Sequence, residues 1–181
     1  MKPLNSIIFN ELYSNLKEQE SFSSIKYLCS EGIETIGYGK TKSSIRKEQL
    51  TWLGVSSWDD IVEVSEAQAD RLLREDIEYF HTACENKFDW FRYQQLSVKY
   101  VVINICFNIG VSGFSKFENT IELIKKRANH EASVEMLDSK WFEDVKGRAL
   151  RLSKIMACGH FDVPSIGLCR EEYRIFRKRV K

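Results

Sequence analysis

Residues 20–39, ESFSSIKYLCSEGIETIGYG, decide the fold class of this chain. The middle of the stretch is rich in β-branched and aromatic residues, and glycines stand at positions 32, 37 and 39. Strand-forming residues separated by glycines predict a short antiparallel sheet with tight turns. We therefore expect a small sheet near the N-terminus.

Helical patterns flank this stretch on both sides. Apolar residues recur at helical spacing over residues 4–19, and a capping-box pattern at 65–68 opens a helix that continues to about residue 85. Residues 95–109, QLSVKYVVINICFNI, are apolar nearly all round, which is typical of a buried central helix. Further helices are predicted at 43–53, 117–128, 131–138, 147–157 and 169–179. The sequence therefore predicts an α+β fold that is mostly helical.

Length and charge exclude several classes of protein. The 181 residues suit one compact domain, or two small lobes that share a core. Lys and Arg number 27 against 26 Asp and Glu, so the net charge of +1 gives no electrostatic argument for nucleic-acid binding. No signal peptide is visible, and the longest apolar stretch, 101–109, is too short to span a bilayer. We expect a chain made in the cytoplasm, with no nucleic-acid partner and no stable membrane insertion.

The five cysteines indicate neither a disulfide scaffold nor a metal site. They are widely spaced, include no CxxC pair and are odd in number, so they cannot all pair within one chain. The three histidines do not cluster with them at zinc-ligand spacing. We expect no metal and no cofactor.

Residues 39–41, Gly-Lys-Thr, raise the alternative of a phosphate-binding loop. A Walker A loop also needs a glycine five residues before its Gly-Lys pair, and Glu34 stands there. Without that glycine the backbone cannot wrap a phosphate, so nucleotide binding is a poor interpretation. The glycines could also serve turns alone, as most glycines beside strands do.

Three side chains of the same stretch are candidates for hydrolytic catalysis. Glu20 stands at the predicted end of the first helix, Cys29 follows after eight residues, and Thr35 follows after five more. A helix end that leads into a hairpin can bring such residues to one cleft rim. A carboxyl group at an apolar cleft edge can protonate a leaving oxygen, and a thiol or hydroxyl opposite could orient water. The spacing alone is not specific.

These residues resemble the motif of the T-even phage lysozymes, glycoside hydrolase family 24, which also includes endolysins and the pesticin toxin domain. In that family, Asp or Cys follows the catalytic glutamate after eight residues, and a Thr-x-Gly-x-Gly turn follows after five more. Glu20, Cys29 and residues 35–39, TIGYG, fit this pattern. Other segments resemble the family in order along the chain: 64–69, 103–110, 113–114, 139–141, 147–149 and 167–176.

The resemblance implies a single lysozyme-like domain over 1–181. A small N-terminal lobe with the sheet, about 15–64, would be joined by a long interlobe helix, about 65–85, to an all-helical C-terminal lobe, about 86–181. The first helix, 1–19, would pack on the C-terminal lobe.

The resemblance also implies a muramidase, which hydrolyses the β-1,4 bond between N-acetylmuramic acid and N-acetylglucosamine in peptidoglycan. Glu20 would protonate the glycosidic oxygen. Thr35, with Cys29, would position the attacking water on the opposite face of the sugar, which gives inversion at the anomeric carbon.

The resemblance further implies that three residues of the later helices bind substrate. Phe107 would supply an apolar floor, and Asn108 would form a hydrogen bond to an N-acetyl group or to the water. Arg148 would lie beside Glu20 and orient its carboxylate. Glu31 and Glu34 could be mistaken for a second catalytic carboxylate, but their turn and strand-border positions favour solvated charges.

The chain departs from the family pattern at three positions near the candidate site. Ser21 stands where glycine is usual, Lys40 where histidine often follows the second glycine, and Cys29 where aspartate is common. A neutral thiol at Cys29 could orient water but would be a poor base. A nucleophilic thiolate, a redox switch and a small buried residue without catalytic role are the alternatives for Cys29.

Several biological settings fit this resemblance. A phage endolysin released with a holin, a bacteriocin, and a delivered toxin or effector with an immunity protein would all act on the cell wall in the periplasm. We expect a monomer whose partner is the glycan strand of peptidoglycan. The alternative function is a lysozyme-fold module that binds peptidoglycan with little or no cleavage.

Overall fold

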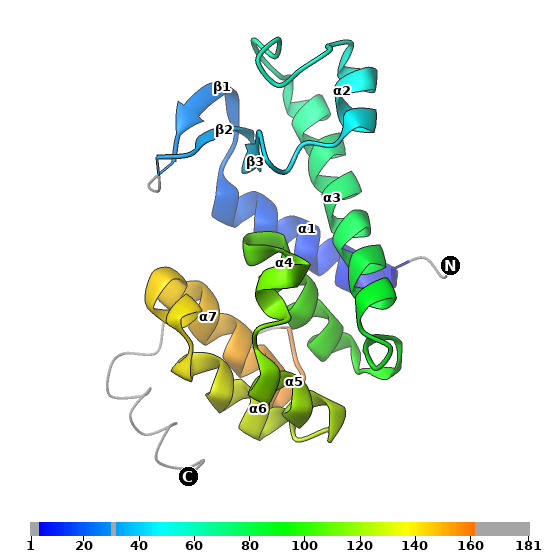
Figure 1. The fold of residues 1–181 in the computed structure, drawn as a ribbon, viewed down its shortest axis with the longest axis vertical. Coiled ribbons are helices and arrows are strands. Elements are labelled where there is room, and N and C mark those ends of the chain that lie inside the picture. The colour runs from blue at the N-terminus through cyan, green and yellow to red at the C-terminus, as the bar shows by residue number, and fades with distance from the viewer. Residues whose placement is uncertain (1–3, 30–31, 162–181) are drawn as a thin grey trace. The chain divides into compact units, whose positions relative to one another are not determined.

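The computed structural model describes residues 4–29 and 32–161 (Figure 1). The chain forms two compact units, Met1–Tyr79 and Phe80–Lys181, and the boundary between them falls inside the long helix α3, Glu66–Lys87. The predicted helix at 169–179 lies outside the described residues. The lobe boundaries implied by the family resemblance stay a prediction.

The first unit begins with helix α1, Ser6–Glu20, as the apolar spacing over 4–19 predicts. Asn5 caps its start, since the Asn5 side-chain oxygen accepts a hydrogen bond of 2.9 Å from the Ile7 N–H. The helix ends at Glu20 because Ser21 adopts φ 52° and ψ 155°, outside the helical region. Glu20 therefore stands in the last turn of α1, directly before the sheet.

The sheet of the first unit is antiparallel, with the strands in the order β1 (Ser23–Leu28), β2 (Glu34–Gly37) and β3 (Lys40–Thr41) (Figure 1). The predicted small N-terminal sheet is confirmed. Tyr27 on β1 lies opposite Thr35 on β2, and Ile36 on β2 lies opposite Lys40 on β3. Gly39, in the turn between β2 and β3, has φ +76°, a value that glycine adopts without steric cost.

Helices α2, Lys47–Leu53, and α3 follow the sheet. The predicted helix at 43–53 begins only at residue 47, because a turn closed by hydrogen bonds to the Thr41 carbonyl comes first. The start of α3 is the predicted capping box. The Ser65 N–H donates to Gln68 Oε1 at 2.8 Å, and the Gln68 N–H donates to Ser65 Oγ at 3.2 Å.

The second unit contains the apolar helix α4, Leu96–Phe114, whose residues up to Cys106 are largely buried, as predicted for 95–109. The helix does not end at 109. Gly110, with φ 75° and ψ 161°, interrupts it, and a further turn follows. In the described part of the chain, α4 is the one helix long and apolar enough to cross a membrane, and half of that apolar window is buried inside the protein. The core helix of a soluble domain has the same properties.

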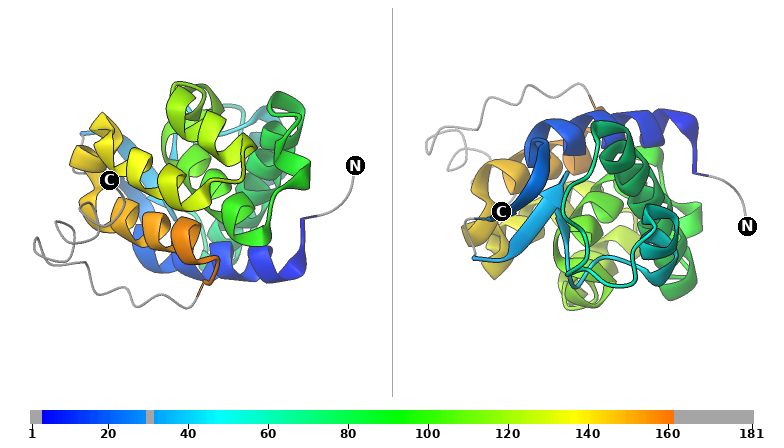
Figure 2. Two further views of the ribbon diagram at one scale, coloured as in Figure 1. Left: turned by 90° about the horizontal axis from the view of Figure 1, so that it is seen from below. Right: turned by 90° about the horizontal axis from the view of Figure 1, so that it is seen from above.

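The remaining helices of the second unit pack on one another, α5 on α6 and α6 on α7, and α7 also packs on α4 (Figure 2). The bounds are η1 Phe91–Tyr93, α5 Glu118–Lys125, α6 Asn129–Glu135, η2 Met136–Asp138 and α7 Lys140–Cys158. Helix α7 begins well before the predicted residue 147, because Ser139 Oγ accepts the Phe142 N–H at 3.2 Å and caps the start. The predicted α+β, mostly helical fold class is confirmed.

Candidate active site

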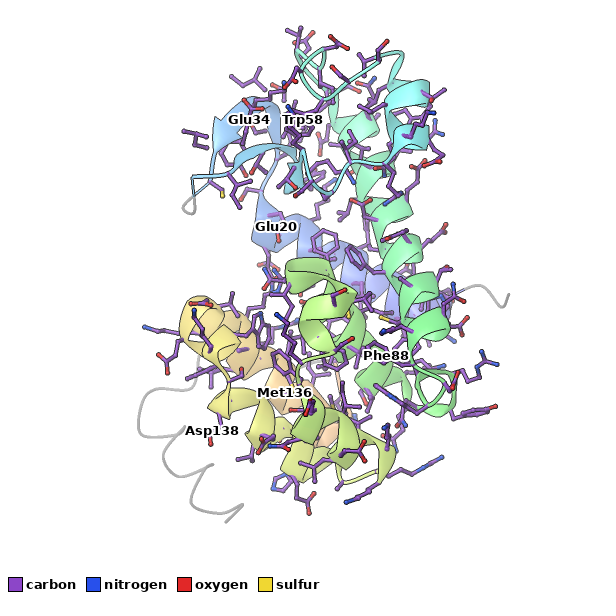
Figure 3. All side chains as sticks on the ribbon, in the orientation of Figure 1. Glu20, Glu34, Trp58, Phe88, Met136 and Asp138 are labelled. Atoms are coloured by element: carbon purple, nitrogen blue, oxygen red, sulfur yellow. The ribbon has the colours of Figure 1, made fainter. Side chains whose placement is uncertain are left out.

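The predicted acid, Glu20, lies against the turn between β2 and β3. Figure 3 labels Glu20 at the C-terminal end of α1. A Cβ built on Gly39 would lie 2.7 Å from Oε2 and 3.1 Å from Cδ of Glu20. The carboxylate therefore fills the space that any side chain at position 39 would need. The structure brings the candidate acid to the glycine turn that the sequence motif contains.

Cys29 and Thr35 are joined through one backbone carbonyl. The Ile33 carbonyl accepts the Cys29 N–H at 3.0 Å and the Thr35 hydroxyl at 3.0 Å. The Thr35 hydroxyl donates its hydrogen bond to the Ile33 carbonyl. It can therefore bind a water as an acceptor, through the lone pairs of Oγ1. Thr35 is only 3% exposed, and Cys29 is half-buried and outside any disulfide. The Thr35 hydroxyl is thus held in one orientation.

Tyr27 lies near these residues, although it belongs to no catalytic motif in the sequence. Its cross-strand position places it opposite Thr35. Burial raises the pKa of Tyr27, and negative charge on Glu20 and Cys29 raises it further. The pKa of the Tyr27 phenol therefore depends on the charges of both Glu20 and Cys29. The two-residue period of the predicted hairpin was the signal that could have indicated Tyr27.

Lys40 has a structural role that is incompatible with a phosphate loop. Its Nζ lies 2.8 Å from both carboxylate oxygens of Asp76 and 2.9 Å from the Ser44 carbonyl oxygen. Lys40 is 2% exposed. An ammonium group has three N–H donors, and these contacts occupy them, so none is left for a phosphate. Burial lowers the pKa of Lys40, and the adjacent Asp76 carboxylate opposes that shift.

Glu34 is an exposed carboxylate, as its strand-border position indicates, but it also has side-chain partners. Its carboxylate accepts a 2.5 Å hydrogen bond from the indole N–H of Trp58, beside which it lies in Figure 3. The Lys26 ammonium lies 3.8 Å from the same carboxylate. Trp58 is buried, so Glu34 satisfies an indole N–H that would otherwise have lost its water partner. Glu31 lies outside the described residues.

Two of the predicted substrate-binding residues, Phe107 and Asn108, stand on α4 in the second unit. Asn108 is exposed, and its Oδ1 accepts the indole N–H of the buried Trp141 at 2.7 Å. Phe107 is half-buried and packs edge-on against Phe80, with 5.8 Å between ring centroids. That these residues touch substrate stays a prediction.

The third predicted substrate-binding residue, Arg148, stands on α7 of the second unit. Its Nε donates to Asn104 Oδ1 at 2.8 Å, and its Nη2 donates to the Asn104 carbonyl at 3.3 Å. Asn104 is fully buried on α4, so Arg148 ties α7 to α4 and satisfies a buried amide. The expected orientation of Glu20 by Arg148 stays a prediction.

A trough of about 560 Å³ lies within the second unit. The rings of Phe117 and Trp141 and the charged side chains of Glu118, Glu135 and Lys140 are among its walls. Aromatic rings together with polar groups are a mixture that suits a carbohydrate or peptide ligand. Across 4–29 and 32–161, no three side chains of the His, Cys, Asp and Glu types gather as a metal site.

Three features define a lysozyme-like α+β protein. Helix α1 ends in a glutamate, a glycine turn receives its carboxylate, and the second unit is helical. The chain belongs to the phage lysozyme family, whose model, described as Phage lysozyme, matches residues 17–154. It is therefore a lysozyme-type glycoside hydrolase of peptidoglycan. Among curated proteins, no sequence gives a significant match. The predicted family resemblance is confirmed.

Proposed function

We propose that the chain is a bacteriolytic muramidase that cleaves the β-1,4 bond between N-acetylmuramic acid and N-acetylglucosamine. The observation that carries this proposal is the contact of the Glu20 carboxylate with Gly39, in the unit that also holds Thr35 and Cys29. A carboxyl group set against the backbone has a fixed position from which it can reach one oxygen of a bound sugar chain.

In the proposed reaction, Glu20 in its acid form gives a proton to the glycosidic oxygen. The bond between that oxygen and the anomeric carbon breaks, and the oxygen leaves as a sugar hydroxyl. A water adds to the anomeric carbon from the opposite face and releases a proton to solvent. The Thr35 lone pairs, oriented by the bond to Ile33, hold that water. The Cys29 thiol helps to position it. The product has inverted configuration.

The proposal also assigns the substrate contacts and the setting. Phe107, Asn108 and Arg148 bind the glycan. The enzyme acts as a monomer on the cell wall of the periplasm, after release with a holin or after delivery as a toxin with an immunity protein.

The test is digestion of purified peptidoglycan, followed by mass spectrometry of the released muropeptides. Glu20→Gln removes the transferable proton and keeps the size of the side chain. Glu18→Gln is the matched control, because Glu18 is an exposed carboxylate on the same helix. We expect reducing-end muramic acid from the wild type and from Glu18→Gln, and none from Glu20→Gln.

Other products would change the conclusion. Reducing-end glucosamine would assign the other glycosidic bond. A wild type that binds cell walls but releases no fragments would show that the chain is a binding module. Full activity of Glu20→Gln would remove the proposed acid from the mechanism.

A further inference from the structure

The turn between β2 and β3 is attached to helix α3 by side chains on both of its sides. The Lys40 network consists of Lys40, Ser44, Arg46, Gln49 and Asp76. The Tyr38 network consists of Lys17, Tyr38, Glu66 and Asp70. All of these residues belong to the first unit.

The Lys40 network is buried and densely bonded. The Asp76 carboxylate receives Lys40 Nζ on both oxygens at 2.8 Å. Its Oδ1 also accepts from Arg46 Nη1 at 2.5 Å and from Gln49 Nε2 at 3.0 Å. A buried carboxylate with this many donors holds its partners in one geometry, because any departure leaves a charge without compensation. The backbone at residue 40 is fixed accordingly.

The Tyr38 network holds the other side of the turn and also reaches α1. The Tyr38 hydroxyl donates to Glu66 Oε1 at 3.0 Å. Lys17 Nζ lies 3.2 Å from the same oxygen, 3.0 Å from Asp70 Oδ1 and 5.1 Å from the centre of the Tyr38 ring. Lys17 precedes Glu20 by three residues on α1, so both lie on one face of the helix. The network therefore ties the turn, through Tyr38, and the end of α1, through Lys17, to the same Glu66 carboxylate.

These contacts exceed what the turn needs to form. Pairing of Ile36 with Lys40, and of Thr35 with Thr41, already closes the hairpin. The residue between the two attached side chains is Gly39, and the Glu20 carboxylate fills the space that a side chain at this position would need. A shift of the turn would thus move the surface on which the candidate acid rests.

We propose that Lys40, held by Asp76, and Tyr38, held by Glu66, are positioning residues for Glu20. They fix the backbone at Gly39 and, through it, the direction of the carboxylate in the reaction proposed above, on which this inference rests. A merely structural role would lower thermal stability and leave the turnover of the folded enzyme unchanged.

The main test is the double variant Lys40→Met/Asp76→Leu, which removes both charges of the buried pair together. Arg46, which also binds Asp76, has a side chain that is 24% exposed and keeps the Glu75 carboxylate 3.9 Å away as a partner. The matched control is Lys42→Met, which breaks the exposed ion pair of Lys42 with Asp59, 2.8 Å apart, two residues further along the chain. We expect kcat on soluble peptidoglycan to fall about tenfold or more in the double variant, with KM nearly unchanged, since small displacements of an acid act on the transition state. Lys42→Met should keep the wild-type kcat.

Tyr38→Phe is the second variant, because it removes one hydroxyl and leaves the ring, so folding is retained even if the double variant fails to fold. We expect a smaller loss of kcat in the same direction. A wild-type kcat in every folded variant of this set overturns the positioning role.

A second readout separates this inference from the proposed function. The ¹³C chemical shift of the Glu20 side-chain carboxyl, measured by NMR, reports its surroundings without any turnover. We expect the shift to change in the double variant and in Tyr38→Phe, but not in Lys42→Met. If the wild type cleaves no peptidoglycan, the proposed function is wrong, and an unchanged carboxyl shift then overturns this inference as well.

Discussion

The carboxylate of Glu20 occupies the space beside Gly39, with Glu20 Oε2 only 2.7 Å from the point where a Cβ at position 39 would lie. Two residues that are far apart in the sequence motif thus meet in space. The glycine serves two purposes there, since it allows φ +76° and leaves room for the carboxylate.

Gly39→Ala should abolish most activity. The added methyl displaces the Glu20 carboxylate, and a displaced acid costs about 100-fold in rate. The positive φ adds about 1–2 kcal/mol of strain. Gly54→Ala is the matched control, because Gly54 has φ +78° but an added Cβ meets no described heavy atom within 4 Å. The loss of turbidity of a cell-wall suspension measures the activity of the two variants, and thermal unfolding measures their stability. Equal activity of the two variants would contradict the prediction.

Thr35→Val and Thr35→Ser separate the hydroxyl of Thr35 from its shape. Valine keeps the shape and removes the hydroxyl that donates to the Ile33 carbonyl, so we expect a stability loss of about 1 kcal/mol and a large loss of kcat. Serine keeps the hydroxyl and should keep much of the activity. The rate of cell-wall hydrolysis measures the change in kcat, and urea unfolding measures the change in stability. Valine and serine variants of equal kcat would exclude a role for the hydroxyl in binding water.

Ser21→Gly should stabilise the chain. Ser21 holds φ 52° and ψ 155°, a conformation close to the region that only glycine occupies freely. Relief of this strain should raise the free energy of unfolding by about 1 kcal/mol, measured by urea denaturation. Ser24→Gly, in the extended strand β1, should lower the same quantity, because there glycine only adds freedom to the unfolded chain. A fall in both variants would show that Ser21 carries no strain.

Titration of Tyr27 should report the charge on Glu20. Burial and the negative charges of Glu20 and Cys29 raise the Tyr27 pKa, because they disfavour the phenolate. Glu20→Gln removes one of those charges, so the Tyr27 pKa should fall toward the ordinary tyrosine value. The ¹³Cζ shift of Tyr27, followed by NMR over alkaline pH, measures this change. Glu18→Gln should leave the titration unaltered. An equal Tyr27 pKa in wild type and Glu20→Gln would show that the charge on Glu20 does not act on Tyr27.

Local pattern was a sound guide where neighbours along the chain decide the structure. Apolar spacing predicted α1 and α4, and the pair Ser65 and Gln68 predicted the start of α3. The start of α7 was predicted too late, because apolar spacing begins after the cap at Ser139. The sequence predicted a helix end before Gly110, where the structure has a break within α4. The position of a glycine in the sequence does not by itself distinguish a kink from a helix end.

The sequence by itself determined the order of helix and sheet, the family, and the identity of the candidate acid, because propensity, caps and motif spacing are local properties of the chain. Only the tertiary structure decided that the ammonium of Lys40 is buried on Asp76, that Glu34 binds Trp58, and that Tyr27 lies beside the candidate site. Lys40 and Asp76 are 36 residues apart, and Glu34 and Trp58 are 24 residues apart. Side-chain pairing over such separations depends on how the elements pack, which local sequence patterns do not reveal.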